Sequence, residues 1–273
     1  MKHSTLLLFT TLASLTIASC SPEKSGPYTT SSAPVKTTAN TDYRTPTPSG
    51  PMQRNADNNF SSNFNKGAGV TFSRVSVPGP YVALTFDDGP HASNTPRLLD
   101  MLRSRNVKAT FYVIGKNVDM YPNIVRRTVA EGHEIGNHTY THPKLSGLSK
   151  DRVFSELQKT DDAIYRAAGV HPRTIRPPYG ALLQSQREMI HGSFGYPTIM
   201  WSVDPLDWKR PGASVVTSRI ISGTSNGAII LVHDLHGSSV DAMPATIDGL
   251  LQKGYRFVTV SQLIAMGGSA AAQ

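Results

Sequence analysis

Two adjacent carboxylates, Asp87 and Asp88, are the residues of this sequence most suited to chemistry. They follow the run 81–86, whose apolar and β-forming residues indicate a buried strand, and Gly89 and Pro90 end the pattern. Neighbouring carboxylates repel each other, so keeping both ionised requires a cation or a strong hydrogen-bond donor nearby. For an isolated Asp-Asp-Gly the simpler interpretation is that Asp88 caps the helix that follows. A chemical role therefore depends on partners elsewhere in the chain.

A second candidate is the pair His138 and His142, which comes just after another apolar segment. In a helical turn this spacing places both imidazoles on one face, within reach of one ion, and Pro143 limits that helix to about one turn. Alone, such a pair is more often solvated or structural than metal-binding. With a carboxylate from another strand end, it becomes a set of two histidines and one carboxylate that leaves positions open for water and substrate.

Polar residues follow apolar segments in three further stretches: Arg176-Pro-Pro-Tyr179, Trp201-Ser-Val-Asp-Pro-Leu-Asp-Trp208 and Leu231-Val-His-Asp234. An arginine stays charged and can pair with a carboxylate, although two prolines also indicate an ordinary rigid loop. Acids mixed with indoles suit a sugar-binding rim, but Trp201 fits a hydrophobic core at least as well. A single histidine at a strand end is usually structural. Each stretch alone thus has a simple structural explanation.

The elements that must position these residues follow from an alternation of short apolar runs with amphipathic segments after Val77, which is typical of repeated βα units. Strands are predicted at 81–86, 109–114, 133–136, 174–176, 197–203, 228–232 and 256–259. Helices are predicted at 95–104, 117–131, 150–168, 182–191, 213–222 and 244–253. Seven strands fit a small barrel.

The polar stretches then lie at the carboxyl ends of at least five predicted strands. Barrels and open α/β sheets build their active sites at this edge. Five independent structural explanations account poorly for the shared position. The sequence therefore predicts an α/β fold in which one edge of the sheet carries the chemistry.

Five stretches, taken in order, resemble the five motifs of the NodB-homology polysaccharide deacetylases, carbohydrate esterase family 4. They are Thr85-Phe-Asp-Asp-Gly-Pro90, His138-Thr-Tyr-Thr-His142, Arg176-Pro-Pro-Tyr179, Asp204-Pro-Leu-Asp-Trp208 and Leu231-Val-His233. The resemblance covers roughly 78–266. It implies a distorted (β/α)7 barrel as the single catalytic domain, and metal-dependent removal of acetyl groups from N-acetylated sugars or from xylan esters.

The resemblance also divides the two carboxylates. It implies that Asp88, His138 and His142 are the metal ligands, with zinc as the usual ion and cobalt or nickel as alternatives. It makes Asp87 the general base, which takes a proton from a water activated by the metal. The metal would neutralise Asp88 and Arg176 would pair with Asp87, so both charges would have a partner.

The same resemblance assigns the remaining motif residues. The backbone N–H of Tyr179 would stabilise the oxyanion, and His233 would protonate the leaving amine while Asp207 raises the pKa of that histidine. Trp208 and Leu231 would line the acetyl pocket. All five motifs are intact, so the sequence gives no sign of an inactive enzyme.

The start of the chain resembles a bacterial lipoprotein. A charged Met1-Lys2-His3 precedes the apolar run 6–17, which is the pattern of an export signal and is too short for an ordinary spanning helix. Ile17-Ala18-Ser19-Cys20 resembles a lipobox, whose cysteine is acylated. A buried inert thiol is the alternative for this cysteine, the single one of the chain. In a bacterium with two membranes, Ser21 would favour the outer one.

The composition then sets the expected domains. Residues 21–74 are rich in Ser, Thr, Asn, Pro and Gly, which bury too little surface to offset chain entropy. We expect a lipoprotein signal peptide over 1–19, a flexible tether over 20–75, the deacetylase domain over 76–268 and a disordered tail over 269–273.

The net charge of +8 is scattered, and no block of basic residues interleaved with aromatics occurs. Nucleic acid is therefore not an expected partner, whereas a mildly positive surface suits an anionic envelope polymer. We expect a lipid-anchored deacetylase in the bacterial cell envelope whose substrate is N-acetylated glycan, with peptidoglycan as the leading candidate. A chitin oligosaccharide deacetylase, an acetylxylan esterase and a non-catalytic glycan-binding lipoprotein remain alternatives.

Overall fold

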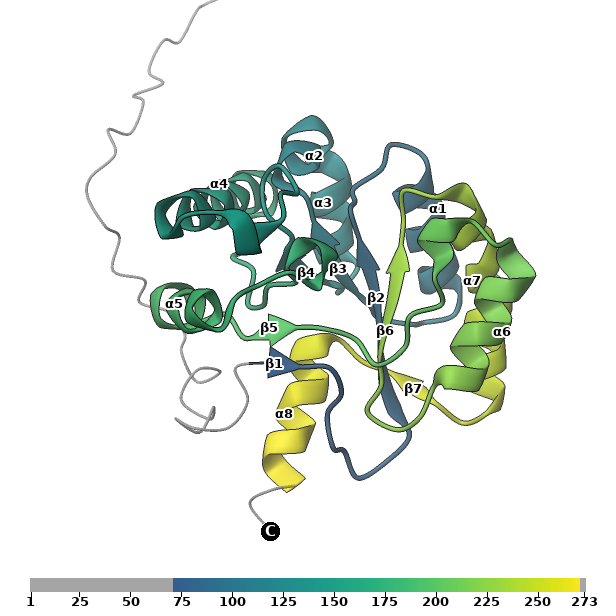
Figure 1. The fold of residues 1–273 in the computed structure, drawn as a ribbon. Helices are drawn as coiled ribbons and strands as arrows, with labels where there is room; N and C mark the ends of the chain where they lie inside the picture. Colours follow the sequence, from purple (N-terminus) through teal and green to yellow (C-terminus); the bar gives the residue numbers. More distant parts are fainter. Residues whose placement is uncertain (1–70, 271–273) are drawn as a thin grey trace, which may run out of the picture. The chain divides into compact units, whose positions relative to one another are not determined.

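The computed structural model describes residues 71–270, with side chains from Thr71 to Gly267. The predictions for the signal peptide, for Cys20 and for most of the tether fall outside this range. Within it, no helix has the length and apolar character that crossing a bilayer requires. The described residues alternate strands and helices around a parallel sheet (Figure 1).

The sheet is built around one central strand, β2, and has the order β4-β3-β2-β6. The bounds are β2 (Tyr81–Asp87), β3 (Thr110–Val113), β4 (Glu134–Asn137) and β6 (Ile229–His233). Every residue of β2 except Tyr81 is buried, as expected of a parallel strand that is covered on both faces. The register places Asp87 opposite both Tyr112 and His233, so the polar ends of β2 and β6 meet.

Three shorter strands complete the pairing: β1 (Thr71–Phe72), β5 (Thr198–Ile199) and β7 (Arg256–Phe257). β7 pairs with the first residues of β2, and β1 pairs with β5. Isolated parallel bridges join Asn137 to Ile175, Ile175 to Thr198, and Val203 to Ile230. These single bridges link β4 through Ile175 to β5, and Val203 to β6, so the parallel sheet continues irregularly beyond both of its edges.

Helices surround the sheet. They are α1 (Asn94–Ser104), α2 (Gly115–Met120), α3 (Pro122–Ala130), α4 (Lys150–Ala168), α5 (Gln184–Phe194), α6 (Ala213–Gly223), α7 (Gly237–Gln252) and α8 (Val260–Ala270). Figure 1 shows α1, α6 and α7 grouped on one side, and α2, α3 and α4 on the other. α4 is delimited clearly, because Ser149 accepts a hydrogen bond from Arg152 N and Gly169 takes the left-handed conformation that ends a helix.

The two faces of β2 have different roles. Val82, Leu84 and Phe86 belong to the main hydrophobic cluster, which also includes the buried faces of the surrounding helices. The alternate residues point to the other face, because successive side chains of a strand alternate. On that face Ala83 packs in a second cluster with residues of α8, whereas Thr85 and Asp87 contact a buried arginine. The inner face therefore changes from apolar to polar toward the end of the strand.

The predicted α/β class is confirmed, but several predicted elements are wrong. The single helix predicted at 117–131 is two helices, α2 and α3, because Pro122 lacks the N–H that a continuous helix needs and instead starts α3. Residues 174–176 form only a bridge at Ile175. α7 begins at Gly237, well before Pro244, since its buried face includes Val240 and Met243. α8 was not predicted, and it continues into the expected tail as far as Ala270.

Candidate functional site

Asp87 and Arg176 form a buried ion pair at the end of β2. Arg176 Nη1 donates to Asp87 Oδ1 at 2.7 Å, and the two side chains are 0% and 4% exposed. Arg176 also donates to Thr85 Oγ1 and to the carbonyl oxygens of Ile199 and Met200. Its guanidinium carbon lies 4.3 Å from the centre of the Tyr112 ring. The arginine is thus fixed on several sides, and it compensates a carboxylate that would otherwise be buried alone.

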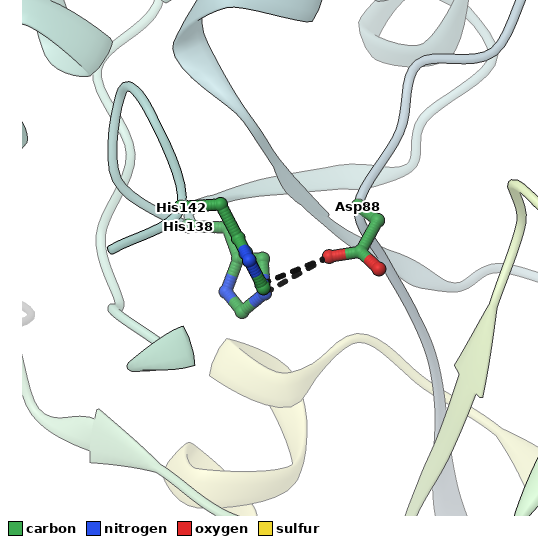
Figure 2. Close-up of side chains that lie close together, drawn as sticks. All are labelled: Asp88, His138 and His142. Atoms are coloured by element: carbon green, nitrogen blue, oxygen red, sulfur yellow. Dashed lines mark ion pairs between the residues drawn. The ribbon is translucent and has the colours of Figure 1, made fainter. Parts of the chain in front are cut away.

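Asp88 leaves the strand in a different direction from Asp87. Its φ is 77°, and Asn117 Nδ2 donates to its carbonyl oxygen at 2.8 Å. Its Oδ1 lies 3.4 Å from His138 Nε2 and 3.2 Å from His142 Nε2. Figure 2 shows both histidines facing the Asp88 carboxylate. The left-handed backbone therefore separates two adjacent carboxylates: one faces an arginine and the other faces two histidines.

The histidines meet through a loop rather than through the helical turn expected from their spacing. Thr139 and His142 both have positive φ, at 66° and 59°. Side chains hold this shape: Asn137 Oδ1 accepts from Thr139 N, and Thr139 Oγ1 accepts from His142 N. Between them, the backbone N–H groups of Tyr140 and Thr141 donate to the Glu156 carboxylate of α4. The predicted proximity is present, but the predicted helical turn is wrong.

The hydrogen bonds of His138 determine which nitrogen faces Asp88. Its Nδ1 lies 2.7 Å from the carbonyl oxygen of Arg176, which can only accept, so Nδ1 carries the proton. The lone pair of the neutral ring is then on Nε2, which is the nitrogen nearest Asp88. A carbonyl partner on the other ring nitrogen is the usual support for a metal-binding histidine.

The electrostatics of these three residues also fit a cation. Burial acts to raise the pKa of Asp88, yet His138 and His142 hold it well below its usual range. Burial acts to lower the pKa of His138, but Asp87 and Asp88 raise it. Ligand atoms of all three residues lie within 4.8 Å of one another, and the buried Asp88 Oδ1 has no hydrogen-bond donor among the described residues. One carboxylate and two imidazoles therefore form a set that fits a divalent transition metal.

A second pair, His233 and Asp207, lies at the end of β6. Asp207 is fully buried and accepts from His233 Nδ1 at 2.8 Å, from His233 N at 2.8 Å and from Ser239 Oγ at 2.6 Å. Burial acts to lower the pKa of His233, but Asp207, with smaller contributions from Asp87 and Asp88, raises it to about 9. His233 is therefore protonated at neutral pH, with Nδ1–H held by Asp207.

The remaining residues implied by the resemblance occupy the rim and the interior. Tyr179 is 70% exposed with φ 59°, and its ring centre lies 4.8 Å from that of His142. Trp208 is half-exposed, with the Lys209 ammonium 4.9 Å from the centre of an indole ring. Leu231 is buried within β6. Asp204 accepts from Leu206 N and so shapes its own turn.

Asp234 is a buried acid to which sequence reasoning assigned no role. It follows His233 directly, and the Thr95 hydroxyl donates to its Oδ2 while Oδ1 has no partner among the described residues. Asp234 Oδ2 also occupies the space that a Cβ at Gly89 would need, so this position is restricted to glycine. Burial raises the pKa of Asp234, and the charges of Asp88 and Asp87 add to this effect, so that the pKa is about 7. An acid directly after a site histidine was the available signal.

Comparisons with known proteins agree with this geometry. Residues 74–198 match the polysaccharide deacetylase family. A peptidoglycan-N-acetylglucosamine deacetylase of Bacillus cereus is 41% identical over 211 residues, which cover 72% of this chain and 76% of the relative. The chain belongs to the polysaccharide deacetylase family. The resemblance to this family that the five motifs predicted is therefore confirmed.

Solved structures of other family members share the fold. The Bc1960 peptidoglycan N-acetylglucosamine deacetylase superposes with a TM-score of 0.69 at 39% identity, covering 72% of this chain and 94% of that one. A family 4 pseudoenzyme from Bacillus anthracis gives 0.68 at 32% identity, covering 72% and 69%. Because a pseudoenzyme has the same fold, the fold alone does not separate active from inactive members.

A peptidoglycan-N-acetylglucosamine deacetylase of Listeria monocytogenes is 43% identical to this chain over 182 residues. These residues make up 67% of this chain but only 38% of that relative's length.

Proposed function

We propose that this polysaccharide deacetylase is a metal-dependent hydrolase that removes N-acetyl groups from an envelope glycan, and that this glycan is peptidoglycan. One observation carries the proposal. A carboxylate held by Arg176 and a histidine held by Asp207 lie opposite each other on adjacent strands, beside the ligand set of Asp88, His138 and His142. Hydrolysis of an amide needs a base, an acid and a means of polarising the carbonyl, and this site has residues for each.

The proposed ligands are Asp88, His138 and His142, and the proposed ion is zinc, with cobalt or nickel as alternatives. When bound there, the ion would supply Lewis acidity toward the acetyl carbonyl and would acidify a water. Asp87 would take a proton from the water whose oxygen attacks the acetyl carbon, so that a carbon–oxygen bond forms before the carbon–nitrogen bond breaks. Its Oδ1 is held by Arg176, while its Oδ2 lies 3.8 Å from His138 Nε2 and so faces the ligand set.

His233 acts as the general acid. Because its pKa is about 9, it carries a proton at neutral pH and can transfer it from Nε2 to the leaving nitrogen as the carbon–nitrogen bond breaks. The products are acetate and a free amine on the sugar. The Tyr179 N–H donates to no acceptor among the described residues and is available to the oxyanion, a contribution of roughly 3–4 kcal/mol in comparable sites. Trp208 and Leu231 are the proposed walls of the acetyl pocket.

Peptidoglycan is supported as the substrate by the names of the relatives from Bacillus cereus and Listeria monocytogenes and by the net charge of +8. The test compares acetate release from peptidoglycan, chitin oligosaccharides and acetylxylan by the purified, metal-loaded protein. Release from peptidoglycan in excess of the other two supports the proposal. Release only from chitin oligosaccharides or only from acetylxylan contradicts the substrate. Glycan binding with no release from any of them contradicts the enzymatic activity.

We also propose that Cys20 carries a lipid anchor that places the catalytic domain in the bacterial cell envelope outside the cytoplasm, at the outer membrane where there are two. The support is the sequence pattern around Cys20. Fractionation of cells that express the full chain or its Cys20→Ser variant tests this. The anchor predicts that the full chain sediments with membranes and the variant does not, whereas equal distribution of both contradicts it.

A further inference from the structure

A cavity of about 360 Å³ adjoins the ligand set on the side of Asp88 and His142. Its walls include His91 from the loop after β2, Ile114 after β3, Met120 and Tyr121 at the end of α2, and Leu235 after β6. The lining does not include His233, Asp207, Tyr179 or Trp208. Asp88 and His142 form the wall that the cavity shares with the ligand set, and the rest of the cavity extends away from the proposed base and acid.

The chemistry of the walls suits a sugar ring. Ile114, Met120 and Leu235 give apolar surface, and Met120 is 63% exposed although it is a large apolar side chain. Binding cavities of 300–1,000 Å³ are usually mostly apolar, with a few polar groups that fix the orientation of the ligand. A pyranose matches this pattern, because its faces are made of C–H groups and its edge carries oxygens. Such a ring also needs a hydrogen-bond donor in the cavity wall for one of its oxygens.

His91 supplies that donor in a fixed tautomer. Its Nδ1 lies 3.3 Å from Ser93 N and 3.2 Å from Asn94 N at the start of α1. Backbone N–H groups can only donate, so Nδ1 accepts and the proton of the neutral ring is on Nε2. Nε2 has no hydrogen-bond partner among the described residues.

The backbone around His91 is also fixed. Its own N–H donates to Thr95 Oγ1 at 2.7 Å, and the amide of Asn94 donates to Leu235 O at 3.1 Å. The second bond, from the Asn94 side chain, connects the start of α1 to the segment after β6, which also lines the cavity. A donor held in this way loses little conformational entropy when a ligand binds.

We infer that this cavity binds the sugar unit next to the one that is deacetylated, and that His91 Nε2–H donates to a hydroxyl or acetamido oxygen of that unit. The inference rests on the proposed function and deepens it by assigning a residue that determines the preferred glycan length. His91 takes no part in the chemical step, because the base and acid of the site are Asp87 and His233.

Two substitutions separate this role from capping of α1. His91→Asn retains a side chain favoured at helix N-termini but lacks Nε2, whereas His91→Ala loses both functions. His191→Asn on α5 is the matched control, since His191 does not line the cavity. Activity is measured as kcat/KM on N-acetylglucosamine monomer, dimer, trimer and tetramer and on 4-nitrophenyl acetate, with melting temperature and metal content measured in parallel.

We expect kcat/KM of the unchanged protein to rise with oligomer length, and His91→Asn to reduce it about tenfold on the trimer and tetramer, the loss of one hydrogen bond to a neutral ligand. Its values on the monomer and the ester, its melting temperature and its metal content should stay unchanged. An equal reduction on every substrate, or no reduction, overturns the inference.

If the unchanged protein releases no acetate, the proposed function fails, and equilibrium binding of the tetramer decides the inference separately. Weaker tetramer binding by His91→Asn than by His191→Asn supports the subsite. Equal binding by the two variants overturns it.

Discussion

The site contains two buried carboxylates that each pair with a cationic residue, and the pairs are used in opposite ways. Asp87 lies 2.7 Å from Arg176, and Asp207 lies 2.8 Å from His233. Arginine stays charged at any pH the protein meets, so the carboxylate is the member of the first pair that can exchange a proton. Histidine titrates, so in the second pair the Asp207 carboxylate orients the ring and the His233 imidazole transfers the proton. The partner thus decides which member is base and which is acid.

Replacing Asp87, the proposed general base, should have the largest effect on activity. Asp87→Asn retains an oxygen that can accept from Arg176 but cannot take a proton from water. We expect acetate release to fall by about 10³–10⁴-fold, which is toward the upper range for a general base. Metal content measured by atomic absorption should stay near that of the unchanged protein. Substantial remaining activity would contradict the assignment of Asp87 as base.

Replacing Arg176, which pairs with Asp87, should lower stability as well as activity. Arg176→Met leaves Asp87 buried without its partner, and both side chains are almost inaccessible. Breaking a buried pair in this way destabilises by about 3–5 kcal/mol. Denaturant unfolding measures the change in free energy. A loss below about 1 kcal/mol, the usual value for an exposed pair, would show that the ion pair is less important than its burial indicates.

Asp207→Asn tests the second pair through its pH dependence. The neutral side chain removes the charge that raises the pKa of His233 to about 9, so this pKa should fall. A general acid works below its pKa, and activity is lost as pH rises through it. The alkaline limb of the kcat profile should therefore move to lower pH, with about 10²-fold less activity at neutral pH. An unmoved alkaline limb would assign it to another group.

The smallest effect should come from Asp234→Asn, at an acid that belongs to neither pair. Its pKa of about 7 lies above the ordinary value, so its contribution to stability is fully present below about pH 4 and is lost as pH rises through 7. The asparagine variant removes this dependence. Melting temperatures of the metal-free protein should decline less between pH 4 and 7 for the variant. Parallel curves for both proteins would contradict the raised pKa.

The sequence predicted those features of the site that depend on neighbouring residues. The apolar run ending at Asp87 predicted β2, and α4 begins after Ser149 and ends before Gly169, as predicted for residues 150–168. Two histidines four apart predicted a shared site, but the loop that joins them depends on Glu156 of another element. Asp234 was missed because its partner Thr95 lies 139 residues away in the sequence. Contacts at this separation leave no periodic signal in one sequence.

Mass spectrometry of peptidoglycan fragments tests the central claim most directly. The purified protein is incubated with peptidoglycan in three states: loaded with zinc, stripped with a chelator, and stripped and then reloaded. The account predicts fragments lighter by one acetyl group in the first and third states and unchanged fragments in the second. Unchanged fragments with zinc present, or the same mass loss after the metal is removed, would contradict a metal-dependent peptidoglycan deacetylase.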